Sequence, residues 1–241
     1  MVRMQRHAQY CPVFFAADIL GDRWNLLIMR EMMGGASRFN EIERCLPSVS
    51  RSLLIQRLRL LTRHGLIDTL PLEGGRGSRY ALTPAGKDLE PVLMAMGEWA
   101  VRWVVGEPRP EELDPTFLVY WLHRRIKFDE VPAQRTVIRL DVIGDARDVF
   151  WLVVQPDEAS LCTKDPGLGD DIYVVADSMA LQRVFAGRIT LDVALADGTI
   201  TITGPTKLVR NFGRWFLWSP FYETTRALLE SEQIGAAGLP H

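Results

Sequence analysis

The stretch from Ser50 to His64, SRSLLIQRLRLLTRH, constrains the fold of this chain more than any other. At 100° per residue it forms a helix with Leu54, Leu58 and Leu61 on one apolar face. The opposite face carries four polar or basic side chains: Ser52, Gln56, Arg59 and Arg63. The pattern therefore predicts a helix that packs on one side and presents two cations on the other.

Both ends of this helix are marked in the sequence. Ser50 is a natural N-cap, and Gly65 stands where a left-handed C-terminal cap would lie. A shorter amphipathic segment begins at Arg38, and residues 47–49 form the turn between the two. This arrangement is typical of a helix-turn-helix, whose second helix enters the DNA major groove. The alternative stays open, because similar helix pairs also occur without nucleic acid.

The residues after Gly65 predict a β-hairpin. Residues 66–70 and 79–82 have strand patterns, and the glycine-rich segment 73–78 lies between them. A hairpin directly after a recognition-type helix is the wing of a winged helix. Arg76 and Arg79 would then contact phosphate or the minor groove, which positions a protein on DNA but specifies little.

Length and composition limit the class of protein. The 241 residues suffice for two ordinary domains, and 47% apolar with 24% charged residues is typical of a soluble globular protein. Neither a bilayer-spanning run nor a signal-peptide pattern is found, so we expect a cytoplasmic protein without membrane contact. The three cysteines are an odd number without metal-ligand spacing, which predicts neither disulfides nor a zinc site.

The net charge of −2 conceals an asymmetry. Residues 1–105 carry 14 basic against 10 acidic side chains, whereas residues 106–241 carry 14 against 20. The helix-turn-helix lies in the basic part. An acidic second part weakens nonspecific attraction to nucleic acid, so we expect it to face away from DNA and to serve another purpose.

A longer motif pattern carries a family resemblance over about residues 11–105. Its elements are Cys11-Pro12, Gly21-Asp22-Arg23-Trp24, Ser37-Arg38-Phe39-Asn40-Glu41, Leu53-Leu54 with Gln56-Arg57-Leu58, Gly65-Leu66-Ile67, and Tyr80-Ala81-Leu82-Thr83-Pro84-Ala85-Gly86. In this order they resemble the HxlR-type transcriptional regulators, which are bacterial winged-helix repressors and activators related to the MarR group.

The resemblance implies a homodimer on a double-stranded DNA operator. The helix expected over 84–105 has an apolar stripe that is either core or dimer contact. Arg57 lies toward the packed side of its helix, where an internal ion pair is the alternative to a DNA contact. The DNA-binding set that we predict is Arg38, Ser50, Arg51, Ser52, Gln56, Arg59, Arg76 and Arg79.

Cys11 precedes a proline at a predicted helix start, close to Arg6 and His7. In some members of the family that the chain resembles, a cysteine here senses electrophiles or oxidants, and a stabilised thiolate would favour such reactivity. The alternative is a packed, inert thiol, since free cysteines are among the most buried residues. For Cys45 and Cys162 we expect the packed state.

Residues 114–241 predict a second domain after a linker at 106–113. The pattern indicates an α+β fold: a helix, four strands, further helices, a strand at 199–203 and a closing helix over 205–217. One mainly antiparallel sheet with covering helices is expected. The order of elements resembles the sterol carrier protein fold, which implies an apolar tunnel and a small apolar or lipid-like ligand. Candidate pocket residues are Trp151, Tyr173, Phe212, Trp215 and Phe216, with a packed core as the alternative.

No catalytic reading is supported, because no nucleophile-base pair, phosphate loop or metal-spaced cluster is found. We therefore expect no enzyme, no cofactor and no metal. The sequence predicts a bacterial DNA-binding transcriptional regulator, acting as a repressor, with a winged-helix domain at 1–105 and an effector domain at 114–241. Two alternatives remain: thiol sensing through Cys11, or a lipid carrier with a degenerate DNA module.

Overall fold

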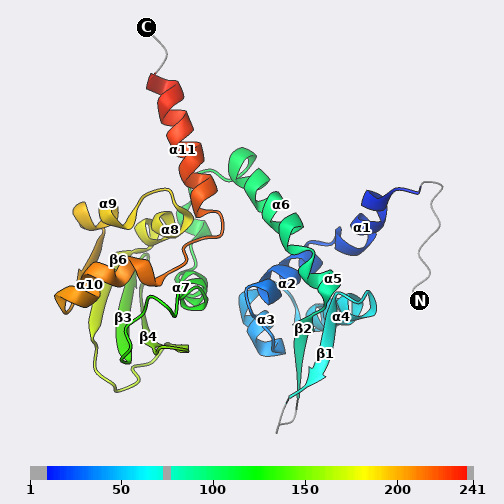
Figure 1. Ribbon diagram of the computed structural model, residues 1–241, viewed down its shortest axis with the longest axis horizontal. Coiled ribbons are helices and arrows are strands. Elements are labelled where there is room, and N and C mark those ends of the chain that lie inside the picture. Colours follow the sequence, from blue (N-terminus) through cyan, green and yellow to red (C-terminus); the bar gives the residue numbers. More distant parts are fainter. Residues whose placement is uncertain (1–9, 73–76, 238–241) are drawn as a thin grey trace. The chain divides into compact units, whose positions relative to one another are not determined.

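The computed structural model describes residues 10–72 and 77–237. The chain forms two compact units, Met1–Ala95 and Met96–His241 (Figure 1). Within the described residues, no helix is long and apolar enough to cross a lipid bilayer. The division between the units falls inside a helix, Glu90–Trp103.

The first unit is a group of short helices followed by a hairpin. Its elements, in order, are α1 (Pro12–Leu20), α2 (Arg23–Met33), α3 (Phe39–Cys45), α4 (Arg51–Arg63), β1 (Ile67–Pro71), β2 (Ser78–Leu82), α5 (Pro84–Lys87) and the first part of α6 (Glu90–Trp103). α3, the turn and α4 make the helix-turn-helix, and β1 with β2 makes the wing. The winged helix-turn-helix expected from the sequence is thus present.

The caps of α4 are those that the sequence predicts. The Ser50 hydroxyl accepts a hydrogen bond from the Leu53 amide at 3.3 Å, and Gly65 has a φ of +70°. Leu54, Leu58 and Leu61 are fully buried, together with Ile28 and Met29 of α2. The apolar face of α4 therefore packs on α2, which leaves its polar face toward solvent.

One helix that was predicted to be continuous is divided into two. The span expected as a single helix over 84–105 is divided into α5 and α6, with Asp88 and Leu89 between them. Pro91 explains the break, because it lacks the amide that a continuous helix would donate to the carbonyl of Lys87.

The second unit contains a five-stranded sheet. Its elements are η1 (Pro110–Glu112), α7 (Pro115–Arg124), β3 (Thr136–Ile143), β4 (Arg147–Val154), β5 (Ala159–Cys162), β6 (Ile172–Asp177), α8 (Ser178–Ala186), α9 (Leu191–Ala196), β7 (Ile200–Thr203), α10 (Thr206–Asn211), η2 (Phe212–Trp215) and α11 (Tyr222–Ala237). The strand order is β5-β4-β3-β6-β7, and only the central pair β3–β6 is parallel. The expected α+β class with one mainly antiparallel sheet is confirmed.

Helices cover one face of this sheet. Strand residues such as Leu140, Leu152 and Val174 form one buried core with residues of α7, α8, α9 and η2. Their neighbours in sequence point to the other face, because side chains alternate along a strand. That face has its own small buried cluster, made of Val137, Trp151 and Val153.

The end of the chain differs from the prediction. The helix expected over 205–217 is α10 followed by the 3-10 turn η2, and the long helix α11 was not predicted. Phe212 and Trp215 are both buried, and a spacing of three residues brings them to the same side of a 3-10 turn. Burial of these rings therefore accounts for the tighter turn.

Candidate nucleic-acid interface

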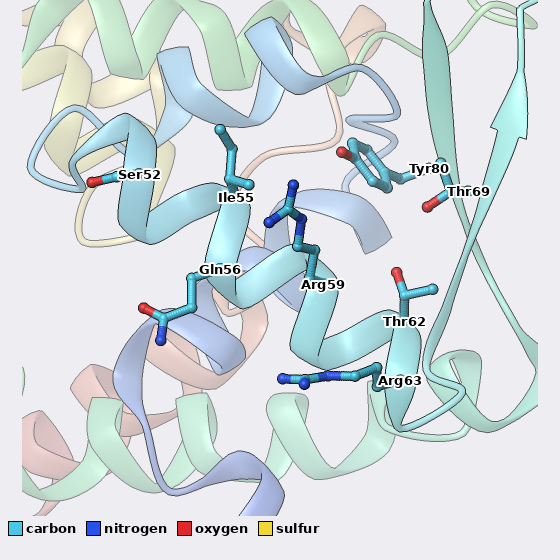
Figure 2. A pocket seen from close by; sticks show the side chains of 8 residues that line it. All are labelled: Ser52, Ile55, Gln56, Arg59, Thr62, Arg63, Thr69 and Tyr80. Carbon is cyan, nitrogen blue, oxygen red and sulfur yellow. The ribbon is translucent and has the colours of Figure 1, made fainter. Parts of the chain in front are cut away.

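A groove of about 710 Å³ runs along the outer face of α4 (Figure 2). The wing contributes Thr69 of β1 and Tyr80 of β2, which face each other in the hairpin register. The described residues that line it include no carboxylate, whereas two are arginines. The part supplied by α4 consists of Ser52, Ile55, Gln56, Arg59, Thr62 and Arg63.

The helical repeat explains why these side chains gather. Ser52, Gln56, Arg59 and Arg63 recur at intervals of three or four residues, which lie on one side of a helix. All four are exposed, because the intervening leucines hold the other side of α4 in the core. The face offers hydroxyl, amide and guanidinium groups, the donors and acceptors that bind base edges and phosphates.

Arg57 is excluded from this face. Its Nη2 lies 2.6 Å from Oδ2 of Asp22, and its side chain is only 22% exposed. Asp22 is also the N-cap of α2, where it accepts a hydrogen bond from the Trp24 amide at 2.9 Å. The internal ion pair that the sequence left open for Arg57 is thus present, and it joins α4 to the start of α2.

Three of the predicted contacts, Ser50, Arg51 and Ser52, lie at the N-terminus of α4. Arg51 is exposed, but its Nη1 lies 2.9 Å from Oε2 of Glu43, and its Cζ lies 4.6 Å from the centre of the Phe39 ring. α3 therefore orients Arg51. The Ser50 and Ser52 hydroxyl oxygens are 3.2 Å apart, with Ser50 engaged as the cap.

The remaining predicted contacts lie beside the groove or outside the described residues. Arg38 and Arg79 are exposed and face each other in an isolated antiparallel bridge, next to the hydrogen bond that the Tyr80 amide donates to the Ser37 carbonyl at 2.6 Å. This bridge joins the wing to the start of α3. Arg76 falls in the undescribed segment 73–76.

The prediction omitted some residues that line the groove. Arg63 was placed on the outer face of the helix, but was not included among the contacts. Thr69 and Tyr80 are brought in by the hairpin, and no local sequence signal shows this. Ile55 was not included among the contacts either. The structure leaves Ile55 at 36% exposure in the groove.

Cys11 occupies the N-cap position of α1 and is partly exposed, with Pro12 at the first helical position. Cys45 is buried and lies 3.0 Å from the Glu41 carbonyl oxygen. Cys162, on the edge strand β5, is partly buried and packs against the cluster of Val137, Trp151 and Val153, in line with the packed state that we expected. The described part of the chain therefore has two thiols with some access to solvent.

The structure does not bring the predicted apolar pocket together. Phe212, Trp215 and Phe216 are buried in the core between the helices and the sheet. Trp151 and Tyr173 lie on strands at positions that face the other side of the sheet. A single pocket lined by all five is therefore corrected to two separate aromatic groups on opposite faces of the sheet.

Trp151 and Tyr173 instead belong to a polar network. They flank Arg139 in the strand register, and the Arg139 Cζ lies 5.7 and 5.1 Å from the two ring centres. Asp141, with a side chain 0% exposed, accepts hydrogen bonds from Arg139 at 3.0 Å and Tyr173 at 2.7 Å, and pairs with Arg147. The network thus fills the sheet face that lies opposite the helices.

The charge state of Asp141 follows from these partners. Burial by itself raises the pKa of its carboxyl group, but the hydrogen bonds from Tyr173, Arg147 and Arg139 together outweigh burial. Its pKa consequently lies below the usual value. The hydrogen bond that the Tyr173 hydroxyl donates to Asp141 raises the pKa of Tyr173.

Two helices joined by a short turn, a following hairpin and an outward face of polar and basic groups define the winged helix-turn-helix class. Comparison with known proteins gives the family. The family profile described as HxlR-like helix-turn-helix matches residues 19–108. The chain belongs to the HxlR-like helix-turn-helix family.

Relatives with this module are HTH-type transcriptional regulators. The uncharacterized regulator YvaP of Bacillus subtilis is 38% identical over 114 residues, which are 46% of this chain and 96% of YvaP. The uncharacterized regulator YybR of the same organism is 34% identical over 37% of this chain and 72% of YybR. A solved structure of reduced YodB from B. subtilis, 33% identical, covers 40% of this chain and 96% of that one, with a TM-score of 0.36.

Proposed function

We propose that this protein is a transcriptional regulator that binds a double-stranded DNA operator through α4 and the wing. The observation that carries the proposal is the groove along α4, whose described lining has two arginines and no carboxylate. DNA is a polyanion, and contacts from arginine to phosphate supply much of its affinity for proteins. The amide of Gln56 and the hydroxyl of Ser52 suit base edges.

We further propose that the regulator acts as a homodimer on a roughly two-fold operator, and that it represses. α6 supports the dimer because it presents large apolar side chains to solvent, with Trp99 59% and Trp103 74% exposed. Val92 and Met96 are exposed on the same helix. Contiguous exposed apolar surface of this kind marks an interaction site, and a two-fold operator requires a two-fold protein.

The experiment that tests DNA binding is a gel shift with the full chain. The DNA upstream of its own gene and a random-sequence pool for selection would be titrated at several salt concentrations. We expect selective binding whose affinity falls with salt, and a uniform loss in Arg59→Ala. Arg210→Ala, an exposed arginine on α10, is the matched control and should bind like wild type. Equal affinity for all sequences would contradict the proposal.

We propose that the acidic second unit is an effector domain for a small apolar or lipid-like ligand, and that it has no enzymatic activity. The order of elements in this unit, which resembles that of the sterol carrier protein fold, supports this role. A ligand would act only through different affinities for DNA-competent and incompetent states of the protein. Adding a host lipid extract to the gel shift tests this, and an unchanged affinity would contradict it.

Thiol sensing at Cys11 is the second candidate, favoured by its partial exposure at the start of α1. If Cys11 senses oxidants, mild oxidation should release DNA from wild type but not from Cys11→Ser. Release from both proteins would exclude Cys11 as the sensor, and Cys162→Ser is the matched control for the other accessible thiol.

A lipid carrier with a degenerate DNA module is the candidate from another class. It predicts lipid transfer between vesicles without any salt-dependent, sequence-selective DNA binding. The gel shift therefore separates it from both regulator proposals.

A further inference from the structure

Ile55 is an unusual side chain for the place that it occupies. It projects from α4 between Ser52 and Arg59, on the side that faces the groove (Figure 2). Its exposed fraction is 36%, whereas Leu54, Leu58 and Leu61 of the same helix are buried. A large β-branched apolar group therefore stands among polar and basic side chains.

Base edges in the major groove offer almost only hydrogen-bonding groups. The one apolar group among the four unmodified bases is the C5 methyl of thymine. An isoleucine that faces base edges can gain affinity only from this methyl, because every other base leaves polar atoms against its side chain. Ile55 also lies in the first half of α4, and the N-terminal residues of a recognition helix are those that reach base edges.

We infer that Ile55 is a specificity-determining residue that recognises the methyl group of a thymine in each operator half-site. This inference rests on the proposed function, since it names the base feature that the same DNA-binding face selects. Gln56, one residue further along the helix, has the amide that pairs with adenine N6 and N7. The two neighbours together favour A·T pairs at the part of the operator that the first half of α4 reaches.

The rigidity of isoleucine supports this role. A β-branched side chain has few χ1 rotamers in a helix, so its methyl groups keep a fixed direction when DNA is absent. Little conformational entropy is then lost on binding. A single exposed apolar residue is common on protein surfaces, so the test has to separate a thymine contact from a merely structural role.

The test removes the methyl group from the DNA and leaves the protein intact. After the operator has been selected from a random pool, each thymine is replaced in turn by uracil, which differs only in lacking the C5 methyl. Loss of one buried methyl contact should weaken binding about fourfold. We expect one thymine in each half-site to show this loss, and uracil at the other thymines to leave affinity unchanged.

Two variants test whether Ile55 is the residue that contacts the thymine methyl group. In Ile55→Ala the same thymine-to-uracil replacement should have little further effect, whereas Ile55→Val, which keeps a branched apolar group, should retain most of the sensitivity. Circular dichroism and a thermal melt check that both variants are folded.

The outcomes are distinct. Selective binding without any uracil-sensitive thymine would overturn the inference and leave the proposed function standing. A sensitive thymine that is equally sensitive in Ile55→Ala would also overturn it, because another side chain would then contact the methyl. Absence of selective DNA binding would overturn the proposed function, and the inference with it.

Discussion

Arg57 of α4 and Asp22 of the α2 N-cap form an ion pair, with Nη2 and Oδ2 2.6 Å apart. The pair is only partly exposed, so water screens it less than a surface pair. It ties α4 to the start of α2, and apolar packing also joins these two helices. One charged contact therefore helps to fix how α4 presents its outer face.

Removing this contact should lower stability. Arg57→Met keeps an apolar stem and leaves the Asp22 cap in place, so we expect the free energy of unfolding to fall by about 1.5 kcal/mol. Denaturant unfolding measures the change. A double-mutant cycle with Asp22→Asn should give a coupling term above about 0.5 kcal/mol. Purely additive losses would show that the two side chains do not stabilise each other.

Two variants of the proposed DNA-binding face should behave differently. Gln56→Ala removes an amide that we propose to contact base edges, and it should change the preference among sequences, by about 1–3 kcal/mol at one base pair. Arg79→Ala, on the exposed wing, should weaken all sequences nearly equally and reduce the slope of log affinity against log salt by about 1. Competition binding with single-base operator variants measures both effects. Equal losses on every sequence for Gln56→Ala would refute its assignment to base readout.

The Asp141 network predicts an acid-sensitive second unit. Because the folded pKa of Asp141 lies below its usual value, its carboxylate stabilises the fold fully above the unfolded pKa of about 3.9. That contribution is lost as the pH falls through the lower, folded pKa. Asp141→Asn should cost about 1.5 kcal/mol at pH 7, because the buried position loses its charged hydrogen bonds.

The pH series separates this effect from general acid unfolding. Unfolding followed from pH 7 to pH 3 should show that the difference in stability between wild type and Asp141→Asn shrinks at the acid end. Asp145→Asn, in the exposed turn after β3, is the control and should change little at any pH. A difference that stays constant down to pH 3 would mean that charge does not carry the Asp141 contribution.

Gly86 should tolerate no side chain. A Cβ built on it would lie 2.1 Å from the Leu66 carbonyl oxygen, which is backbone and cannot move without shifting the start of the hairpin. We therefore expect Gly86→Ala to lower the free energy of unfolding by about 1–3 kcal/mol. At Gly106 a Cβ would meet nothing within 4 Å, so Gly106→Ala is the matched control. Thermal melts compare the two, and equal stability would contradict the close approach at Gly86.

Local signals made α4 and the wing predictable. Ser50, Gly65 and the leucine repeat act within a few residues of the positions that they determine, so the sequence suffices to locate the helix and its outer face. The sequence predicted the residues that line the groove less completely. Tyr80 and Thr69 join it through the pairing of β1 with β2, and the exposure of Ile55 depends on how α4 is rotated against α2.

The second unit shows where sequence patterns cannot decide. Phe150 and Trp151 are adjacent and both buried, one in the core under the helices and the other on the opposite face. A strand that is apolar on both sides does not reveal which face the helices cover. For that reason the aromatic residues were assigned to one pocket, although the strand register separates them. The change from α10 to the 3-10 turn η2 likewise depends on the burial of Phe212 and Trp215, which no local pattern shows.

The strand order β5-β4-β3-β6-β7 bears on the sequence of events during synthesis. β3 lies at the centre, and its parallel partner β6 leaves the ribosome only after β4 and β5 have been made. Ile138 cannot meet Ile172 before then, and the β7 edge comes later still. In the first unit a short hairpin joins β1 to β2, and the whole helix-turn-helix and wing precede β3 in the chain. A nascent chain would therefore complete its winged helix-turn-helix while the central sheet of the other unit is still missing strands.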